Sequence, residues 1–176
     1  MNVTVLRLGH RKERDKRITT HCALVARAFG AKAIILSGEM DDSVVESVKG
    51  VVKNWGGKFS ITYKKDWKKT LEKFKGFKIH CTMYGEKPEK KISLARKKAE
   101  VMVVIGAEKV PSDVYKMVDA NIAVGSQPHS EVAALAIILL KLLGEKGLWA
   151  ERAGAKIRIF PSEKRKNIVK RGKKNI

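Results

Sequence analysis

Runs of hydrophobic residues without polar alternation recur along the chain and set its predicted architecture. The most complete run is VMVVIG at residues 101–106, and a shorter one, NIAVG, follows at 121–125. Such runs, rich in β-branched residues, are typical of strands that are buried on both faces of a parallel sheet. Four related runs precede them, so we expect strands at residues 2–8, 31–36, 59–63, 77–83, 101–106 and 121–125.

Helical spacing of apolar residues appears between these strands. The clearest case is ITTHCALVARAF at residues 18–29, which Gly30 follows as a favourable helix-ending residue. Apolar repeats, acids at helix starts and glycine stops predict helices at residues 18–29, 41–55, 67–74, 92–99 and 132–143. The alternation of strands and helices predicts an α/β fold, a parallel sheet with helices on both faces.

The last two predicted strands each end in a glycine, at Gly106 and Gly125. In open α/β sheets, ligands bind beyond the carboxyl ends of the strands, and glycine there lets a ligand approach the backbone. We therefore expect a ligand cleft between the loops that follow, at residues 107–111 and 126–130, with Ser130 as a helix N-cap. Ordinary strand-to-helix turns are the alternative. Neither loop matches a nucleotide-phosphate fingerprint, which disfavours an NAD-type oxidoreductase.

A strongly charged segment, GHRKERDKR at residues 9–17, separates the first predicted strand from the first predicted helix. Its five basic residues against two acidic ones leave a local charge of +3. We predict a loop, because the segment is too polar to bury. It is either a solvated connection or an anion-binding loop near the sheet edge.

Beyond Leu143 the pattern changes. KIRIF at residues 156–160 alternates charged and apolar residues, and NIVK at 167–170 can pair with it after a turn, which predicts a β-hairpin. Residues 156–176 contain nine Lys or Arg and one Glu, a balance of +8. A disordered basic tail is the alternative, but the strand-like KIRIF favours order in part of it.

Composition favours a single globular domain that binds a polyanion. The 176 residues are 44% hydrophobic and carry a formal net charge of +20, far above what solubility requires. Cys22 and Cys81, both in apolar contexts, make neither a disulfide framework nor a metal site, so we expect no metal and a reducing cytoplasm. We also expect no membrane association, because no apolar stretch is long enough to cross a bilayer and no signal peptide is recognisable.

Taken together, these segments resemble the SPOUT class of RNA methyltransferases, and most closely the archaeal tRNA (cytidine(56)-2'-O)-methyltransferases. The resemblance rests on four blocks in order: RLGHRKERDKRITTHCALVARAFGA at 7–31, HCTMYGE at 80–86, VVIGAEKVP at 103–111 and NIAVGSQPHSEVAALAIILL at 121–140. It extends to about Leu143, and the hairpin and tail look like the C-terminal addition of this particular family. We accordingly expect a methyltransferase domain at residues 1–147 and a basic hairpin and tail at 148–176.

The resemblance implies properties that the residue patterns alone do not. It implies a SPOUT fold with a C-terminal trefoil knot, S-adenosyl-L-methionine as methyl donor, a homodimer and a tRNA substrate. The methyl group is expected on a ribose 2'-hydroxyl, that of cytidine 56 in the T-loop. A non-catalytic basic RNA-binding protein is the alternative function, although a pure binding module has no need of the glycine-ended cleft.

The predicted donor-binding residues come from the two loops and from the end of the fourth strand. They are Cys81, Gly106, Ala107, Glu108, Lys109, Val110, Val124, Gly125, Ser126, Gln127, Pro128, His129, Ser130 and Glu131. The segment at 129–131 departs from the asparagine-containing one that many relatives carry before this helix.

Catalysis is predicted to depend on arginine, on Arg17 first and then on Arg11 and Arg14. A ribose 2'-hydroxyl is a poor nucleophile and benefits from a base or from a cation that stabilises the developing alkoxide. Arginine stays protonated in proteins, so its expected role is to orient ribose and phosphate and to stabilise charge. Many relatives carry an arginine where Leu24 stands here. The alternative bases are His10, His21 and Glu131.

Overall fold

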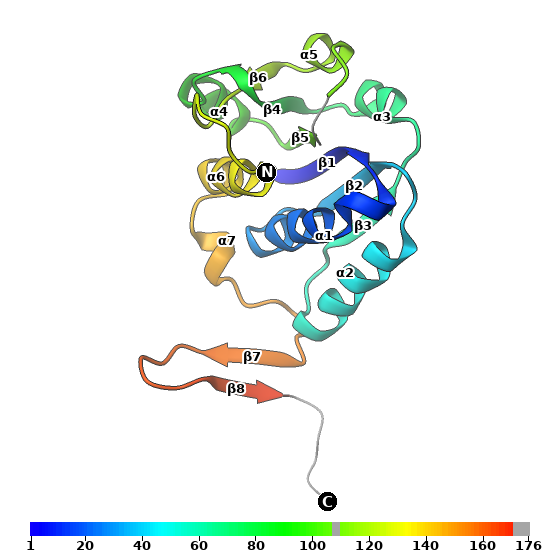
Figure 1. Cartoon of the computed structure of the whole chain (residues 1–176). Coiled ribbons are helices and arrows are strands. Elements are labelled where there is room, and N and C mark those ends of the chain that lie inside the picture. Colours follow the sequence, from blue (N-terminus) through cyan, green and yellow to red (C-terminus); the bar gives the residue numbers. More distant parts are fainter. Residues whose placement is uncertain (107–109, 171–176) are drawn as a thin grey trace, which may run out of the picture.

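A computed structural model describes residues 1–106 and 110–170 of the chain. Six strands form one parallel sheet in the order β3-β2-β1-β5-β4-β6, which confirms the predicted fold class (Figure 1). Because β4 lies between β5 and β6, three consecutive strand ends meet at one edge of the sheet. The strands are β1 Asn2–His10, β2 Ala33–Gly38, β3 Ser60–Tyr63, β4 Phe77–Glu86, β5 Glu100–Gly106 and β6 Ala120–Ile122.

Helices cover both faces of this sheet, as predicted. The larger apolar core joins the sheet to α1, α2, α4 and α6, and the smaller core joins it to α3 and α5. Strand β5 contributes to both cores: Val101 and Val103 lie in the larger core, and Met102 and Val104 lie in the smaller one. This explains its unbroken apolar run. The helices are α1 Lys12–Ala28, α2 Asp42–Trp55, α3 Trp67–Lys73, α4 Glu89–Ala95, α5 Asp113–Met117, α6 Glu131–Leu143 and α7 Lys146–Trp149.

The predicted charged loop at residues 9–17 is wrong. Strand β1 continues to His10, and α1 begins at Lys12, six residues before the expected start. Side chains supply what a polar helix start needs: Asp15 accepts hydrogen bonds from the backbone N–H and the guanidinium of Arg11, and Glu39 accepts from the backbone N–H of Lys12. Asp15 and Thr19 are buried, so this part of the helix has an inward face that is polar rather than apolar.

Smaller differences concern the ends of other elements. Helix α4 begins just after Pro88, three residues earlier than expected, and β6 stops at Ile122, so Gly125 lies in the loop beyond it. Helices α5 and α7 occupy segments in which we predicted no helix. The predicted N-cap of α6 is confirmed, because the Ser130 hydroxyl accepts a hydrogen bond from the Val132 N–H at 3.2 Å.

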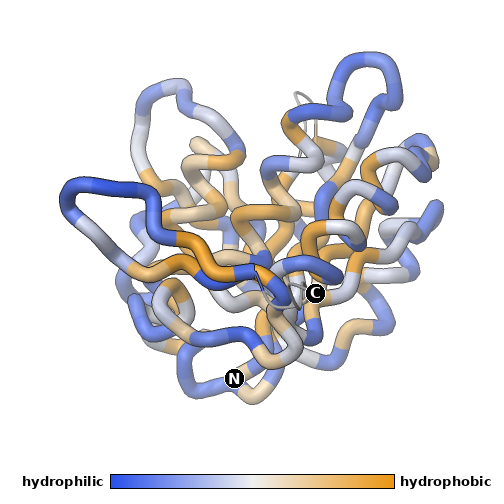
Figure 2. The backbone as a smooth tube through the Cα atoms, turned by 90° about the horizontal axis from the view of Figure 1, so that it is seen from below, coloured by the Kyte–Doolittle hydropathy of each residue, from blue (hydrophilic) through white to orange (hydrophobic). Residues whose placement is uncertain are grey.

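The predicted C-terminal hairpin is also confirmed. Strands β7 Ile157–Phe160 and β8 Asn167–Lys170 pair antiparallel and project from the body beyond α2 and α7 (Figure 1). Figure 2 shows hydrophobic strands that end in a hydrophilic tip. The hairpin is held at the end of α2, where the Gly57 N–H donates to the Ala153 carbonyl and the Lys156 N–H donates to the Asn54 carbonyl. Among the described helices, none is long and apolar enough to span a membrane.

Candidate functional site

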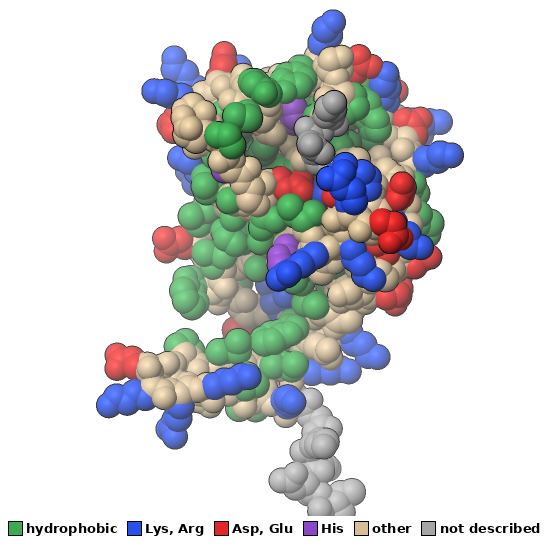
Figure 3. All heavy atoms as spheres, viewed as in Figure 1, with side chains coloured by type: hydrophobic (Ala, Val, Ile, Leu, Met, Phe, Trp, Pro, Cys, Tyr) green, Lys and Arg blue, Asp and Glu red, His purple; other side chains and the backbone are tan. Residues whose placement is uncertain are grey.

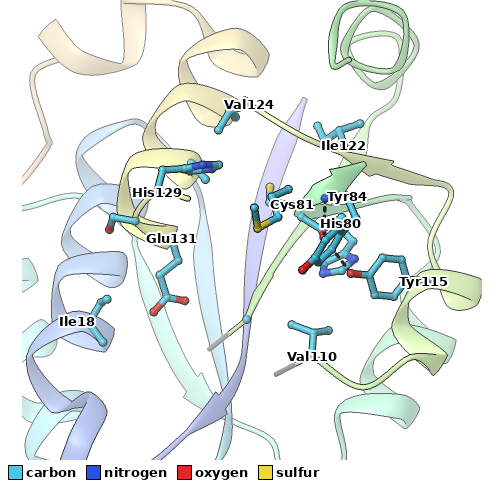
Figure 4. Close-up of a pocket in the computed structure, with 15 residues that line it drawn as sticks. Ile18, His80, Cys81, Tyr84, Val110, Tyr115, Ile122, Val124, His129 and Glu131 are labelled. Atoms are coloured by element: carbon cyan, nitrogen blue, oxygen red, sulfur yellow. Dashed lines mark hydrogen bonds between the residues drawn. The ribbon is translucent and has the colours of Figure 1, made fainter. Parts of the chain in front are cut away.

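A cavity of about 690 Å³ opens at the carboxyl edge of the sheet, where the ends of β4 and β5 meet the start of α6 (Figure 4). Its volume lies in the range of pockets that hold small ligands. The lining residues come from six segments: Ile18 of α1, the 80–84 stretch of β4, Gly106, Val110 with Tyr115, Ile122 with Val124, and 129–131 with Ala134.

Half of the predicted donor-binding residues line this cavity. They are Cys81, Gly106, Val110, Val124, His129, Ser130 and Glu131. Four others, Gly125, Ser126, Gln127 and Pro128, lie exposed on the loop between β6 and α6, outside the described lining. The remaining three, Ala107, Glu108 and Lys109, fall outside the residues that the structure describes.

The glycines of the site have different roles. A Cβ atom on Gly106 would collide with the Val110 side chain, so glycine at this position leaves room for that side chain at the end of β5. A Cβ atom on Gly85 would lie 2.5 Å from backbone atoms of Ile122, so β4 and β6 approach more closely there than any side chain permits. A Cβ atom on Gly125 would meet nothing within 4 Å. The open space beside Gly125 is compatible with the predicted approach of a ligand to the backbone there, whereas Gly85 serves the packing of two strands.

One residue of the cavity wall, Glu131, belongs to a buried ion pair. Arg7 of β1 is fully buried, and its Nη2 atom donates to Oε1 of Glu131 at 2.8 Å. Burial raises the pKa of the Glu131 carboxyl, although the charge and hydrogen bond of Arg7 oppose that shift. The other carboxylate oxygen, Oε2, has no hydrogen-bond partner among the described residues. Sequence reasoning missed Arg7 because a charged residue within a strand reads as solvent-facing.

The opposite wall carries a polar cluster around His80. This residue is fully buried within β4, where the pairing of that strand with β5 ends, and its Nδ1 atom lies 2.9 Å from Oδ1 of Asn121. The ring of Tyr115 packs edge-on against the imidazole, with centroids 4.8 Å apart, and its hydroxyl is 2.9 Å from the Thr82 hydroxyl. Burial lowers the pKa of His80, which keeps it neutral. The HCTMYGE block predicted that this part of β4 belongs to the site, but the sequence did not predict the contacts of His80 with Asn121 and Tyr115.

The three predicted catalytic arginines lie along the first turns of α1. Arg11 is bound to Asp15, with Nε and Nη2 at 3.0 and 3.1 Å from the carboxylate oxygens. Arg14 and Arg17 are exposed and make no hydrogen bond or ion pair with the described residues. Arg14 precedes Ile18 by one helical turn and therefore faces the same way as a residue of the cavity wall. None of the three arginines lines the cavity.

Other candidate groups are occupied or distant. His10 is buried, with Nδ1 at 2.8 Å from the Thr19 hydroxyl and Nε2 at 3.5 Å from Asp41, and burial lowers its pKa. His21 is exposed on α1, away from the cavity lining. Burial raises the pKa of the Cys81 thiol to about 12, so this cysteine is not an activated nucleophile. Within the described residues, no three His, Cys, Asp or Glu side chains are grouped as a metal site.

Comparison with known proteins identifies the family that carries this site. The family model described as tRNA ribose 2'-O-methyltransferase, aTrm56, matches residues 55–169, more than half of the chain. The chain belongs to this family. Two relatives named tRNA (cytidine(56)-2'-O)-methyltransferase agree with that placement. The Archaeoglobus fulgidus protein is 54% identical over 96% of this chain and 99% of its own, and the Pyrococcus horikoshii protein is 52% identical over 95% and 84%.

Solved structures place this aTrm56 chain in the SpoU/TrmH fold, the SPOUT class. The SpoU methyltransferase AviRb from Streptomyces viridochromogenes, in complex with AdoMet, matches with a TM-score of 0.62 and 12% identity, over 82% of this chain and 58% of its own. The TrmH/SpoU tRNA modifying enzyme of A. aeolicus matches with a TM-score of 0.57 and 15% identity, over 86% and 80%. The expected family and fold class are thus confirmed.

Proposed function

We propose that this protein transfers a methyl group from S-adenosyl-L-methionine to the ribose 2'-hydroxyl of cytidine 56 in tRNA. The observation that carries the proposal is the cavity that joins the ends of β4 and β5 to the first residues of α6, in a chain of the aTrm56 family. The named nucleotide follows the names of the relatives that are about half identical to this chain.

The residues that line the cavity suit the methyl donor. Val110, Ile122 and Val124 offer apolar surface, while the unpartnered oxygen of Glu131 and the polar cluster of His80 stand on opposite walls. A few convergent polar atoms in a mostly apolar cleft are typical of small-ligand sites. When bound, S-adenosylmethionine supplies a methyl group already activated on a sulfonium. The protein's task is then to hold the donor and the ribose in line, which supplies roughly 7–11 kcal/mol of the barrier in favourable cases.

The rim of the cavity suits RNA. Tyr84 lines it while 81% of the residue remains exposed, so its ring offers a face on which an unpaired base can stack. Arg14 and Arg17 lie on helix α1, and their guanidinium groups make no hydrogen bond or ion pair with the residues that the structure describes. We propose that these arginines, together with Arg11, orient the ribose and its phosphates and stabilise charge on the 2'-oxygen.

The remaining expectations complete the proposal. We propose that residues 148–176 act as a basic RNA-binding appendage to a methyltransferase domain at 1–147, and that the protein works in the cytoplasm. The trefoil knot is proposed for the two segments at 103–111 and 121–140, as the family resemblance implies. A homodimer is proposed through the exposed apolar face of α6.

A methyl-transfer assay tests the activity. Purified protein is incubated with radiolabelled S-adenosylmethionine and three tRNAs: an unmodified transcript, one with uridine at position 56, and one with 2'-deoxycytidine there. We expect about one methyl group per molecule on the first and none on the third, because the deoxy substitution removes only the acceptor oxygen. Equal labelling of the first and third tRNAs contradicts a 2'-O target. Tight tRNA binding without any labelling supports the non-catalytic alternative.

A further inference from the structure

His80 presents a buried hydrogen-bonding atom that the protein itself does not use. The residue lines the cavity and is fully buried, and its Nε2 atom has no hydrogen-bond partner within residues 1–106 and 110–170. Buried polar atoms without a partner are rare in folded proteins, and each one calls for an explanation such as a bound ligand or water.

The surrounding hydrogen bonds determine what this atom offers. The side-chain N–H of Asn121 donates to the Tyr115 carbonyl at 2.9 Å, and a carbonyl oxygen can only accept, so the orientation of the Asn121 amide is fixed. Its oxygen must then face His80, and the hydrogen bond of 2.9 Å between them requires a proton on Nδ1 of the imidazole. In a neutral imidazole the second nitrogen is then an acceptor.

We propose that Nε2 of His80 accepts a hydrogen bond from an N–H or O–H donor on the nucleoside part of the ligand that fills this cavity. The proposal rests on the proposed function for the identity of that ligand, the methyl donor. Asn121 acts as a positioning residue, since it holds the proton on Nδ1. Full burial of His80 favours a contact with the methyl donor over one with a tRNA nucleotide. A small molecule that enters the cavity can reach a buried side chain, whereas a nucleotide of tRNA approaches from the rim.

The chemistry of the two walls indicates which end of the donor lies here. Figure 4 shows Glu131 and His80 on opposite sides of the pocket, with Cys81 between them. A positively charged amino group is best placed near the free carboxylate oxygen of Glu131. Beside His80 stand the Tyr115 ring, Val110 and Ile122, apolar surfaces that suit an adenine ring and its uncharged donors.

Two substitutions of His80 separate its two nitrogens. Asparagine reaches as far as Nδ1, so His80→Asn keeps the contact with Asn121 and removes the acceptor at the position of Nε2. Glutamine reaches as far as Nε2, so His80→Gln can keep the acceptor. We expect His80→Asn to weaken binding about tenfold, because the ligand donor is left without a partner, and His80→Gln to stay within about threefold of wild type.

Calorimetry with two probes gives the readout. S-adenosylhomocysteine carries both the amino acid and the nucleoside, whereas methylthioadenosine lacks the amino acid. Because the proposed contact is to the nucleoside, His80→Asn should weaken both probes by the same factor, with thermal unfolding showing that each variant is folded. Wild-type affinity of His80→Asn for methylthioadenosine overturns the proposal, as does equal weakening by both substitutions.

Nitrogen NMR of the wild-type imidazole provides a test that needs no variant. We expect the free protein to carry the His80 proton on Nδ1, and the Nε2 resonance to shift when S-adenosylhomocysteine binds. A proton on Nε2 in the free protein overturns the proposal. Binding of the probe without methylation of any tRNA contradicts the proposed function but leaves the His80 contact standing. A wild-type protein that binds neither probe overturns both.

Discussion

The chemistry of the cavity depends on a few residues that are charged or polar where the fold is most buried. Arg7 and Glu131 are 124 positions apart, yet their side chains are 2.8 Å apart and join β1 to the first turn of α6. Removing one partner of a buried ion pair typically costs about 3–5 kcal/mol, since the other charge is left without compensation. The sequence marked Glu131 as an acid at a helix start, but it contained no local signal that pairs it with a strand arginine. The sequence likewise contained no local signal that pairs His80 with Asn121, which lies 41 positions further along the chain.

The arginines of α1 lead to the first prediction at this scale. Arg17 is exposed in mid-helix rather than placed before the helix, and the next residue, Ile18, lines the cavity. If its planar fork holds ribose and phosphate together, Arg17→Lys should lose turnover by about tenfold or more while it keeps most tRNA affinity. Arg17→Ala should lose more of both. Rates are measured at saturating tRNA and donor.

Lys16 provides the matched control for Arg17. It is exposed on the same turn of α1 and carries the same charge. Unlike Arg17, which precedes the cavity residue Ile18, Lys16 follows the buried Asp15, which does not line the cavity. Lys16→Ala should therefore lower tRNA affinity slightly and leave turnover unchanged. Wild-type turnover of Arg17→Ala would transfer the proposed role to Arg14, the arginine one turn before Ile18.

At the scale of elements, apolar periodicity predicted the strands and the core helices well and failed where an inward face is polar. The segment at 9–17 looks like a loop because its inward positions hold Asp15 and, further on, Thr19 instead of aliphatic residues. Asp15 binds the N-terminal turn through Arg11, and Thr19 binds His10, which in turn faces Asp41. A helix stabilised by such pairings across the fold gives little signal to a pattern of hydrophobic spacing. The hairpin was predictable because its alternation is local.

The hairpin tip carries the second prediction. Lys164, Arg165 and Lys166 are exposed at the turn between β7 and β8. Each phosphate contact contributes about 0.7 to 0.9 to the slope of log affinity against log salt. Changing all three residues to alanine should therefore reduce the steepness of tRNA binding by about two to three, with little effect on turnover at saturating tRNA.

A second basic triplet gives the control for the hairpin. Arg96, Lys97 and Lys98 are exposed just before β5, near the amino edge of the sheet and so away from the cavity. Their triple alanine variant changes the net charge by the same amount. If general charge attracts the tRNA, both triple variants will have the same slope, and a specific role for the hairpin is contradicted.

At the scale of the whole molecule, the site is assembled from segments that only the complete topology brings together. The order β1-β5-β4-β6 places residues near 80, 106, 122 and 131 around one cavity, and Arg7 of β1 binds Glu131 in its wall. The general rule for parallel sheets predicted the edge at which the cavity lies, and half of the donor-binding residues that the resemblance implied line that cavity. The rule did not predict β4 as the central wall of the cavity, because strand order depends on long-range pairing.

An exposed apolar surface on α6 and α7 supports the proposed homodimer. Ile137 and Leu140 of α6 are 41% and 37% exposed, and Trp149 of α7 is 79% exposed. Figure 3 shows hydrophobic side chains gathered over α6 and α7, whereas Lys and Arg lie at the outer edge of the hairpin. Contiguous apolar surface of this kind marks interaction sites. The start of the same helix, at Glu131, lines the cavity, so a partner packed on α6 would also lie beside this cavity.

The dimer yields the last prediction. Light scattering should give a mass of twice the 19.6 kDa chain, and Leu140→Asp should halve it, because a carboxylate in an apolar interface is left unpaired. Met40→Asp is the control, since Met40 is 57% exposed on the loop before α2 and the substitution is chemically the same. It should remain dimeric and active, while Leu140→Asp should lose methyl transfer although its thermal unfolding shows a folded chain. A monomeric wild-type protein, or a dimeric and active Leu140→Asp variant, would exclude this face of α6 as the interface.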